Sequence, residues 1–342
     1  MRKIKVVSIY SGAGGLDLGF HKAGFRNIFS TDYWQPACNS LKKNKISNQV
    51  ICDDIRNINF QNIVKEEKVD CLIGGPPCPA YSKSRFYLKD KKRAMEDENS
   101  FTLHEYFRAL KELKPKVFLF ENVFGFVYKP HKEAFDYLEK ESKKLGYDIS
   151  YKVINCANYG IPQTRERFFC IGVKKGNKKF IFPEETHANP EKNKNKKKWI
   201  TCGDILSDID FDLPEDENMI AGSKHKDLLK EIPPGENYLY FTKEKNHPSP
   251  KFKWRSRYWS FLLKLSQNRP SWTIQASHSN NMGPFHWKNR FLRISEIKRI
   301  QTFDDNYHLC GDYKTQWRQV GNAVPPLMAK ILAKSIKEQY FE

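Results

Sequence analysis

The stretch Ile4-Lys5-Val6-Val7-Ser8-Ile9-Tyr10-Ser11-Gly12-Ala13-Gly14-Gly15 decides the fold that we expect for this chain. Residues 4–10 alternate between apolar and polar side chains, which is typical of a β-strand. The glycines predict a turn, and the apolar residues that follow have helical spacing up to Gly24. A strand, a glycine turn and a helix in this order can hold a phosphate or a cofactor at the helix N-terminus. The sequence therefore predicts an α/β fold with a ligand site at this turn.

Acidic residues follow the next two expected strands. A strand over residues 27–31 ends at Asp32, and residues 50–52 form another strand before Asp53-Asp54-Ile55. In α/β nucleotide folds an acid at the end of the second strand holds ribose hydroxyls, and Tyr33 or Trp34 can then lie against an adenine. Each acid alone is more commonly a helix cap. Both together favour an adenosine site, but Asp17 stands where a dinucleotide fingerprint has glycine, which disfavours a nicotinamide cofactor.

The charge of the chain favours a polyanionic partner. Among its 342 residues, 59 Lys and Arg face 40 Asp and Glu, which gives a net charge of +19. Nucleic acid is the first candidate for such a chain, although an AT-rich genome would also enrich lysine. We see no apolar run of about eighteen residues, as a membrane span requires, and no signal peptide, so we expect a cytoplasmic protein.

A second stretch, Ile73-Gly74-Gly75-Pro76-Pro77-Cys78-Pro79-Ala80-Tyr81-Ser82, places one thiol in a stiff turn after an apolar strand. The pattern fits a presented nucleophile, but a buried structural cysteine explains it equally well at this point. The eight cysteines contain no C-x-x-C pair, so no metal site is indicated. Glu121 directly follows another apolar strand, residues 117–120, and is a candidate general acid or base.

The segment after residue 174 changes in composition. Residues 174–198 hold nine Lys against three Glu and read as an exposed boundary, for which a solvated face is the simpler explanation. Residues 199–290 are irregular and mix aromatic side chains with Arg255, Arg257, Arg269 and Arg290. This mixture suits a nucleic-acid surface, because arginine binds phosphates and base edges.

Six stretches in order resemble the DNA cytosine-5 methyltransferase family, and the match covers most of the chain outside residues 180–268. They are the glycine loop 11–15, Pro77-Cys78, Glu121-Asn122-Val123, Gln163-x-Arg165-x-Arg167, the helix 290–303 and Gly321-Asn322-Ala323-Val324-Pro325-Pro326. A lone Pro-Cys would mean little, whereas six motifs in the family's order are specific.

The resemblance implies a catalytic set of Cys78, Glu121, Arg165 and Arg167. Cys78 would add to C6 of a flipped-out cytosine, which makes C5 nucleophilic toward the methyl group of S-adenosylmethionine. Glu121 would hydrogen-bond N3 and the exocyclic amine of the ring. Arg165 would contact the cytosine O2, with Arg167 supporting it.

The resemblance also implies that the cofactor is S-adenosylmethionine, that the product is S-adenosylhomocysteine, and that no metal takes part. It further implies which residues bind the cofactor. These are Tyr10, Gly12, Ala13, Gly14, Gly15, Asp32, Tyr33, Asp54, Ile55, Asn322 and Ala323.

The implied fold is a doubly wound, mostly parallel seven-stranded sheet of the Rossmann-like methyltransferase type, with a smaller irregular target-recognition domain. Residues 1–182 and 318–342 would form the catalytic and cofactor-binding domain. Residues 183–290 would form the recognition domain, and 291–317 a hinge and supporting helix.

We therefore expect a bacterial-type enzyme that methylates cytosine in a short duplex DNA sequence and protects host DNA in a restriction-modification system. We expect a monomer that forms no stable complex with a cognate restriction endonuclease. Two alternatives stay open: a transfer RNA cytosine-5 methyltransferase with the same chemistry, and a catalytically silent DNA-binding regulator. The recognition sequence and the base that removes the C5 proton are not encoded in any pattern that we can read.

Overall fold

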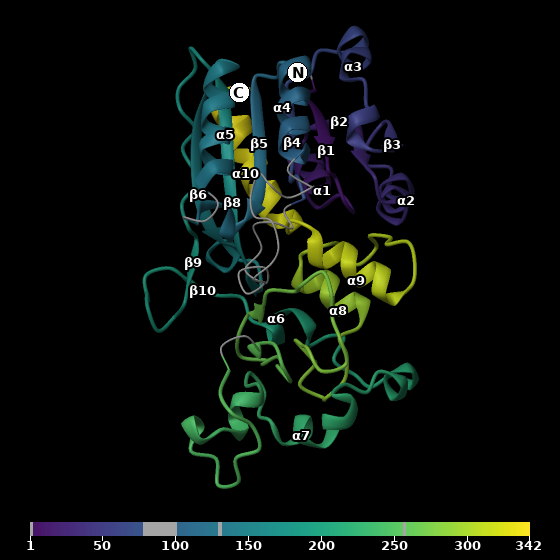
Figure 1. Cartoon of the computed structure of the whole chain (residues 1–342), viewed down its shortest axis with the longest axis vertical. Coiled ribbons are helices and arrows are strands. Elements are labelled where there is room, and N and C mark those ends of the chain that lie inside the picture. Colours follow the sequence, from purple (N-terminus) through teal and green to yellow (C-terminus); the bar gives the residue numbers. More distant parts are fainter. Residues whose placement is uncertain (1–2, 78–100, 129–131, 256–257) are drawn as a thin grey trace.

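The strands β1 and β4 lie in the middle of a seven-stranded sheet, whose order is β3-β2-β1-β4-β5-β8-β6 (Figure 1). Its strands are β1 (Lys5–Ile9), β2 (Arg26–Asp32), β3 (Val50–Cys52), β4 (Cys71–Gly74), β5 (Val117–Val123), β6 (Tyr147–Asn155) and β8 (Glu166–Lys174). β8 runs antiparallel to both of its neighbours, while the other pairs are parallel. The predicted doubly wound sheet with one mixed edge is confirmed.

The structure is a computed structural model, which describes residues 3–77, 101–128, 132–255 and 258–342. The proposed nucleophile Cys78, the charged segment 83–99 and Arg257 lie outside the described residues.

The helices are α1 (Gly15–Lys22), α2 (Gln35–Asn44), α3 (Phe60–Glu66), α4 (Phe101–Leu113), α5 (Lys132–Lys144), α6 (Cys202–Leu206), α7 (Lys226–Glu231), α8 (Ile294–Ile300), α9 (Tyr313–Asn322) and α10 (Pro326–Tyr340). Two short strand pairs are β7 (Gln163–Thr164) with β11 (Ser271–Trp272), and β9 (His187–Ala188) with β10 (Lys197–Lys198). The 3-10 helices are η1 (Ile55–Asn57), η6 (Phe124–Val127), η8 (Cys156–Tyr159), η9 (Pro214–Asn218), η10 (Ser223–His225), η11 (Tyr238–Phe241) and η12 (Lys243–Lys245). In the part of the chain that the structure describes, no helix is both long and apolar enough to cross a membrane.

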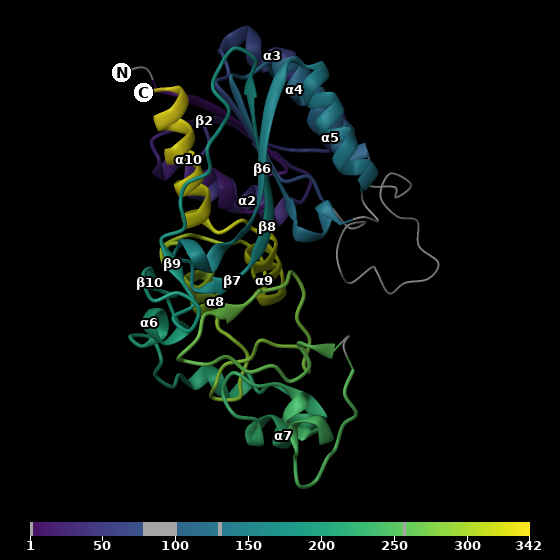
Figure 2. The same ribbon diagram turned by 90° about the vertical axis from the view of Figure 1, so that its left-hand side faces the viewer.

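The two faces of the sheet bury separate apolar clusters, because alternate side chains of a strand point to opposite faces. Val7, Leu72 and Phe118 stand in register on neighbouring strands and pack with residues of α3, α4 and α5. The residues next to them on the same strands face the other way and pack with α1 and α10. Figure 2 shows the sheet nearly on edge, with α10 on one side and α4 and α5 on the other.

Most of the described chain from α6 to β11 is irregular and lies below the sheet in Figure 1, with α8 and α9 between the two parts. α9 was not expected from the sequence. Its buried residues are Trp317, Gln319, Val320 and Gly321, so its inner face is only partly apolar. Asp312 caps the helix by accepting a hydrogen bond from the Thr315 amide (2.8 Å).

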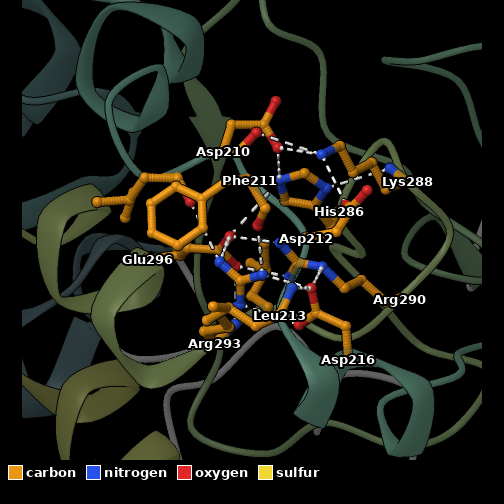
Figure 3. Close-up of polar contacts among 12 residues, drawn as sticks. Asp210, Phe211, Asp212, Leu213, Asp216, His286, Lys288, Arg290, Arg293 and Glu296 are labelled. Atoms are coloured by element: carbon orange, nitrogen blue, oxygen red, sulfur yellow. Dashed lines mark hydrogen bonds and ion pairs between the residues drawn. The ribbon is translucent and has the colours of Figure 1, made fainter.

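A network of buried charges ties this irregular part to α8 (Figure 3). Arg290 and Glu296 are both buried and form two hydrogen bonds of 2.7 and 2.9 Å. Arg293 pairs with Asp216 on η9, and its amide donates to Glu296 (2.7 Å). His286 is fully buried beside these charges, and its burial lowers its pKa to about 4. Since unpaired charges are costly inside a protein, these pairs hold η9 and its flanking loop against the start of α8.

Candidate active site

A cleft of about 940 Å³ lies at the carboxyl ends of the sheet strands. One wall comes from the ends of β1, β2, β4 and β5, and the other from residues 272–277 and 318–324. The strand order reverses between β1 and β4, and crevices at such switch points are the usual ligand sites of α/β sheets. The fold therefore places the candidate site between the sheet and the part of the chain below it.

The glycine loop lines this cleft through Gly12, Ala13 and Gly15. Gly12 has a φ of +53°, and a Cβ built on it would meet no atom within 4 Å, so the loop leaves open space there. A Cβ on Gly15 would come within 2.2 Å of the Val324 carbonyl oxygen, so only glycine allows the segment around Val324 to pack against this loop. Gly14 does not line the cleft; a Cβ there would meet Leu41.

Asp32 lies at the end of β2 in the cleft wall. Its carboxylate accepts one hydrogen bond from the Gly12 amide (2.8 Å) and one from the Trp34 amide (2.9 Å). Burial raises its pKa, although these bonds act in the opposite direction. A carboxylate has about four acceptor sites, so Asp32 keeps capacity for two hydroxyl groups of a ribose.

The other expected cofactor residues divide into two groups. Tyr10, Tyr33, Asn322 and Ala323 line the cleft, whereas Asp54 and Ile55 do not. The Asp54 carboxylate instead accepts two hydrogen bonds from the Arg56 guanidinium (2.9 and 2.6 Å) and one from the Arg56 amide (2.9 Å).

Glu121 is the acidic side chain in the cleft near the end of β4. The sequence suggested that Glu121 directly follows a strand that ends at residue 120. In the structure β5 continues to Val123, so Glu121 lies within the strand. A Cβ on Gly75 would come within 2.6 Å of its Oε2 atom, so the chain that leads to position 78 passes directly beside this carboxyl group. Burial raises the pKa of Glu121, and Arg167 and Arg165 offset this only in part. A carboxyl group with a raised pKa is suited to donate a proton or a hydrogen bond.

Arg167 is the arginine that faces Glu121. Its Nε lies 3.2 Å from Glu121 Oε1, and both side chains keep a small exposed fraction of 15% and 12%. Arg167 lines the cleft, as does Glu166, whereas Arg165 does not.

Arg165 is fully buried and binds backbone carbonyl groups instead of the cleft. It donates to the oxygens of Ile274 (3.0 Å), Gly321 (2.8 Å) and Ala323 (3.0 Å). Burial, together with Arg167, lowers its pKa to about 9, so it stays charged at neutral pH. In the structure Arg167 reaches the cleft and Arg165 joins its walls, whereas the resemblance implied that Arg165 contacts the base and Arg167 supports it.

We expect the replacement Arg165→Met to destabilise the protein by about 3 kcal/mol or more, because three buried carbonyl groups lose their donor. Thermal melting of the two proteins measures this difference. Arg167→Met is the matched control, since Arg167 is partly exposed and makes no such bridge, and it should melt close to the wild type. An Arg165→Met protein that melts as the wild type does would contradict the proposed role.

The sequence-based site lacked several of the residues that line the cleft, among them Arg318 and Trp272. Arg318 lies in the cleft wall, and its guanidinium carbon sits 4.5 Å from the centre of the Trp34 ring. Its position three residues before the motif that starts at Gly321 was the available signal. Trp272 also lines the cleft, and its backbone pairs with Thr164 across β11 and β7. Only this long-range pairing brings it to the site.

Comparisons with known proteins relate the chain to one family and one fold. The sequence model of the family described as C-5 cytosine-specific DNA methylase matches residues 4–338. Type II methyltransferase M.SacI of Streptomyces achromogenes is 36% identical, with 98% of this chain and 93% of that protein covered. Type II methyltransferase M.NgoFVII of Neisseria gonorrhoeae is 33% identical, with 98% and 86% covered. The structure of the methyltransferase EhMeth of Entamoeba histolytica has the same fold, with a TM-score of 0.67 at 19% identity over the full length of both chains.

Proposed function

The chain belongs to the C-5 cytosine-specific DNA methylase family and is a DNA cytosine-5 methyltransferase, and from this we propose its detailed reaction. The enzyme transfers a methyl group from S-adenosylmethionine to C5 of a flipped-out cytosine in a short, specific duplex sequence, through a covalent adduct of Cys78 with C6. The observation that carries this proposal is Glu121, a buried carboxyl group with a raised pKa beside the strand end that leads to Cys78.

The proposed reaction begins with the thiolate of Cys78. Cytosine C5 is a poor nucleophile, and bond formation between Cys78 and C6 converts the ring into an enamine that is nucleophilic at C5. Glu121, in its protonated form, donates to N3 and stabilises the charge that develops on the ring. After methylation a base removes the C5 proton, the electrons of that bond re-form the C5–C6 double bond, and Cys78 leaves.

We propose that Arg167 contacts the cytosine O2 and that Arg165 holds the cleft in shape. Arg167 lines the cleft beside Glu121, whereas the three carbonyl contacts of Arg165 occupy its two terminal nitrogens. This order reverses the one inferred from the sequence.

The described residues fit S-adenosylmethionine, which when bound supplies a sulfonium methyl group that nucleophiles attack. Gly12 leaves open space along the loop, and Asp32 keeps acceptor capacity for the two ribose hydroxyls. We propose that Tyr10, Tyr33 and Asn322 complete this site, because they line the same cleft. The remaining expected residues do not line the cleft. Their proposed role is to pack behind its walls and hold them in place: these are Gly14, Asp54 and Ile55.

The cytosine must leave the duplex to reach this cleft, at a cost of a few kcal/mol. We propose that residues 1–182 with 318–342 carry out the chemistry, that residues 183–290 read the duplex, and that 291–317 form the hinge. The net charge of +19 favours this contact with DNA. Since relatives are named Type II methyltransferases, we also propose a role in a restriction-modification system in the cytoplasm, as a monomer without a stable endonuclease complex.

Transfer of a labelled methyl group from S-adenosylmethionine to duplex DNA and to transfer RNA tests the proposal. We expect label in DNA, and bisulfite sequencing of DNA from cells that express the protein should then reveal one short methylated sequence. Label in transfer RNA alone would establish the alternative substrate, and no label in either would favour the silent DNA-binding regulator.

A further inference from the structure

Two exposed tryptophans stand at the edge of the cleft. The rings of Trp259 and Trp272 meet edge to face, with centroids 5.4 Å apart and an interplanar angle of 71°. About half of Trp259 (49%) and 39% of Trp272 remain exposed. Trp272 lines the same cleft as Glu121 and Arg167, while Trp259 contacts Trp272 from outside the cleft lining. Because the two exposed rings touch each other, they form an apolar patch at this edge, which marks a candidate contact surface.

The backbone that carries Trp272 is fixed to the catalytic side of the cleft. Trp272 pairs with Thr164 across β11 and β7, and Thr164 Oγ1 donates to the Ser271 oxygen (3.1 Å). Thr273 Oγ1 in turn donates to the Thr164 oxygen (3.0 Å). The next residue, Ile274, accepts a hydrogen bond from Arg165. The backbone of Trp272 is therefore held at a set position relative to Arg165, and so to Arg167 two residues further along the chain.

The second indole is anchored independently. The carbonyl oxygen of Trp259 accepts a hydrogen bond from Nδ2 of the buried Asn237 (2.7 Å). Asn237 also caps η11 through its Oδ1. The pair is thus supported from two separate segments of the chain, which is the arrangement needed to press a ring against a ligand.

We propose that Trp272, backed by Trp259, stacks on a base that stays in the duplex and loses its neighbour when the target cytosine leaves. This inference rests on the proposed function. A base beside the vacated position exposes an apolar face, and aromatic side chains bind such faces whatever the sequence. A side chain at the entrance of the cleft stabilises the opened duplex in this way, because it replaces the lost base–base contact.

The position of the pair favours a base in the duplex over the extruded cytosine itself. The extruded ring belongs beside Glu121 and Arg167, whose side chains are almost covered, with exposed fractions of 12% and 15%. The two indoles keep larger exposed fractions of 39% and 49%, and of the two only Trp272 lines the cleft. The exposed rings therefore suit a base that stays in the duplex, whereas the extruded cytosine lies deeper, beside Glu121 and Arg167.

Binding of two duplexes by the full chain tests this inference. The first duplex carries the sequence that bisulfite sequencing identifies, and the second is identical except for an abasic site in place of the target cytosine. Trp272→Ala should weaken binding of both duplexes about tenfold or more, because the stacked base is present in both. Trp272→Phe should restore most of this affinity, since it keeps an aromatic face.

The matched control is Tyr151→Ala, because Tyr151 on β6 has a similar exposed fraction (49%) but lies outside the cleft lining and outside residues 183–290. It should bind both duplexes as the wild type does. Loss of affinity for the first duplex alone would show that Trp272 stacks on the extruded cytosine and would overturn the inference. Unchanged affinity for both would overturn it as well.

A measurement on the wild-type protein covers the case in which Trp272→Ala does not fold. A 5-iodouracil base next to the target cytosine should cross-link to Trp272 or Trp259 under near-ultraviolet light, and mass spectrometry identifies the linked peptide. Cross-links confined to other segments would contradict the inference. A wild-type protein that does not methylate the first duplex would refute the proposed function instead, so the two failures are distinguishable.

Discussion

Cys78→Ser is expected to abolish methyl transfer while duplex DNA binding persists. The attacking species is a thiolate, and a free cysteine with a pKa of about 8.5 supplies a few per cent of it at neutral pH. A serine hydroxyl loses its proton far less readily, so the variant has almost no anion to attack C6. The described residues before position 78 are held beside Glu121, since Asn122 Nδ2 donates to the Pro76 oxygen (3.4 Å) and Thr102 Oγ1 to the Pro77 oxygen (3.3 Å).

Two measurements check this expectation. Methyl transfer from labelled cofactor should fall below detection in the variant, while its dissociation constant for duplex DNA stays within a few-fold of the wild type. A duplex with 5-fluorocytosine at the target position should trap the wild type covalently, because the base that removes a proton from C5 cannot remove fluorine. The variant should form no such adduct. Residual turnover, or a covalent complex that survives denaturation, would mean that another group is the nucleophile.

Much of the fold could be predicted because its signals are local. The alternation in residues 4–10, the glycines after it and the helical spacing beyond them specify β1, the turn and α1 without any distant contact. The apolar runs at 50–52 and 117–120 likewise became β3 and part of β5. Helix α9 was not predicted, because its buried face includes Gln319 and Gly321 and therefore lacks the apolar periodicity of a helix. The cap at Asp312 was its only local signal.

The sequence could not predict which of Arg165 and Arg167 lines the cleft, because this depends on contacts with residues far away in the chain. Two residues apart on a continuous strand would share one face. Arg165 instead lies between β7 and β8, and its carbonyl partners are 109 to 158 residues away. The same holds for Trp272, whose place at the cleft follows from its pairing with Thr164. Motif spacing identifies such residues, but only the tertiary contacts show which of them reach the cleft.

Glu121→Gln is expected to lower the rate of methyl transfer by about 10²- to 10⁴-fold, the usual contribution of a positioned acid. The glutamine side chain keeps the size of the glutamate but cannot deliver a proton to N3 of the ring. Single-turnover transfer with saturating DNA and cofactor measures this loss directly. A rate within tenfold of the wild type would show that Glu121 is not the acid of the reaction.

The pH dependence separates loss of the acid from loss of the fold. Because burial raises the pKa of Glu121, the native protein binds this proton more tightly than the unfolded chain does. The stability that this proton contributes is complete below the unfolded pKa and is lost as pH rises through the folded pKa. Glu121→Gln removes that loss, so at pH 7 the variant should be at least as stable as the wild type in thermal melting. Its rate should still rise with pH as the Cys78 thiolate forms, but the decline that deprotonation of Glu121 causes at higher pH should disappear. A variant that keeps the decline would assign the proton to a different group, and one that melts lower would place Glu121 in the stability of the cleft instead of in its chemistry.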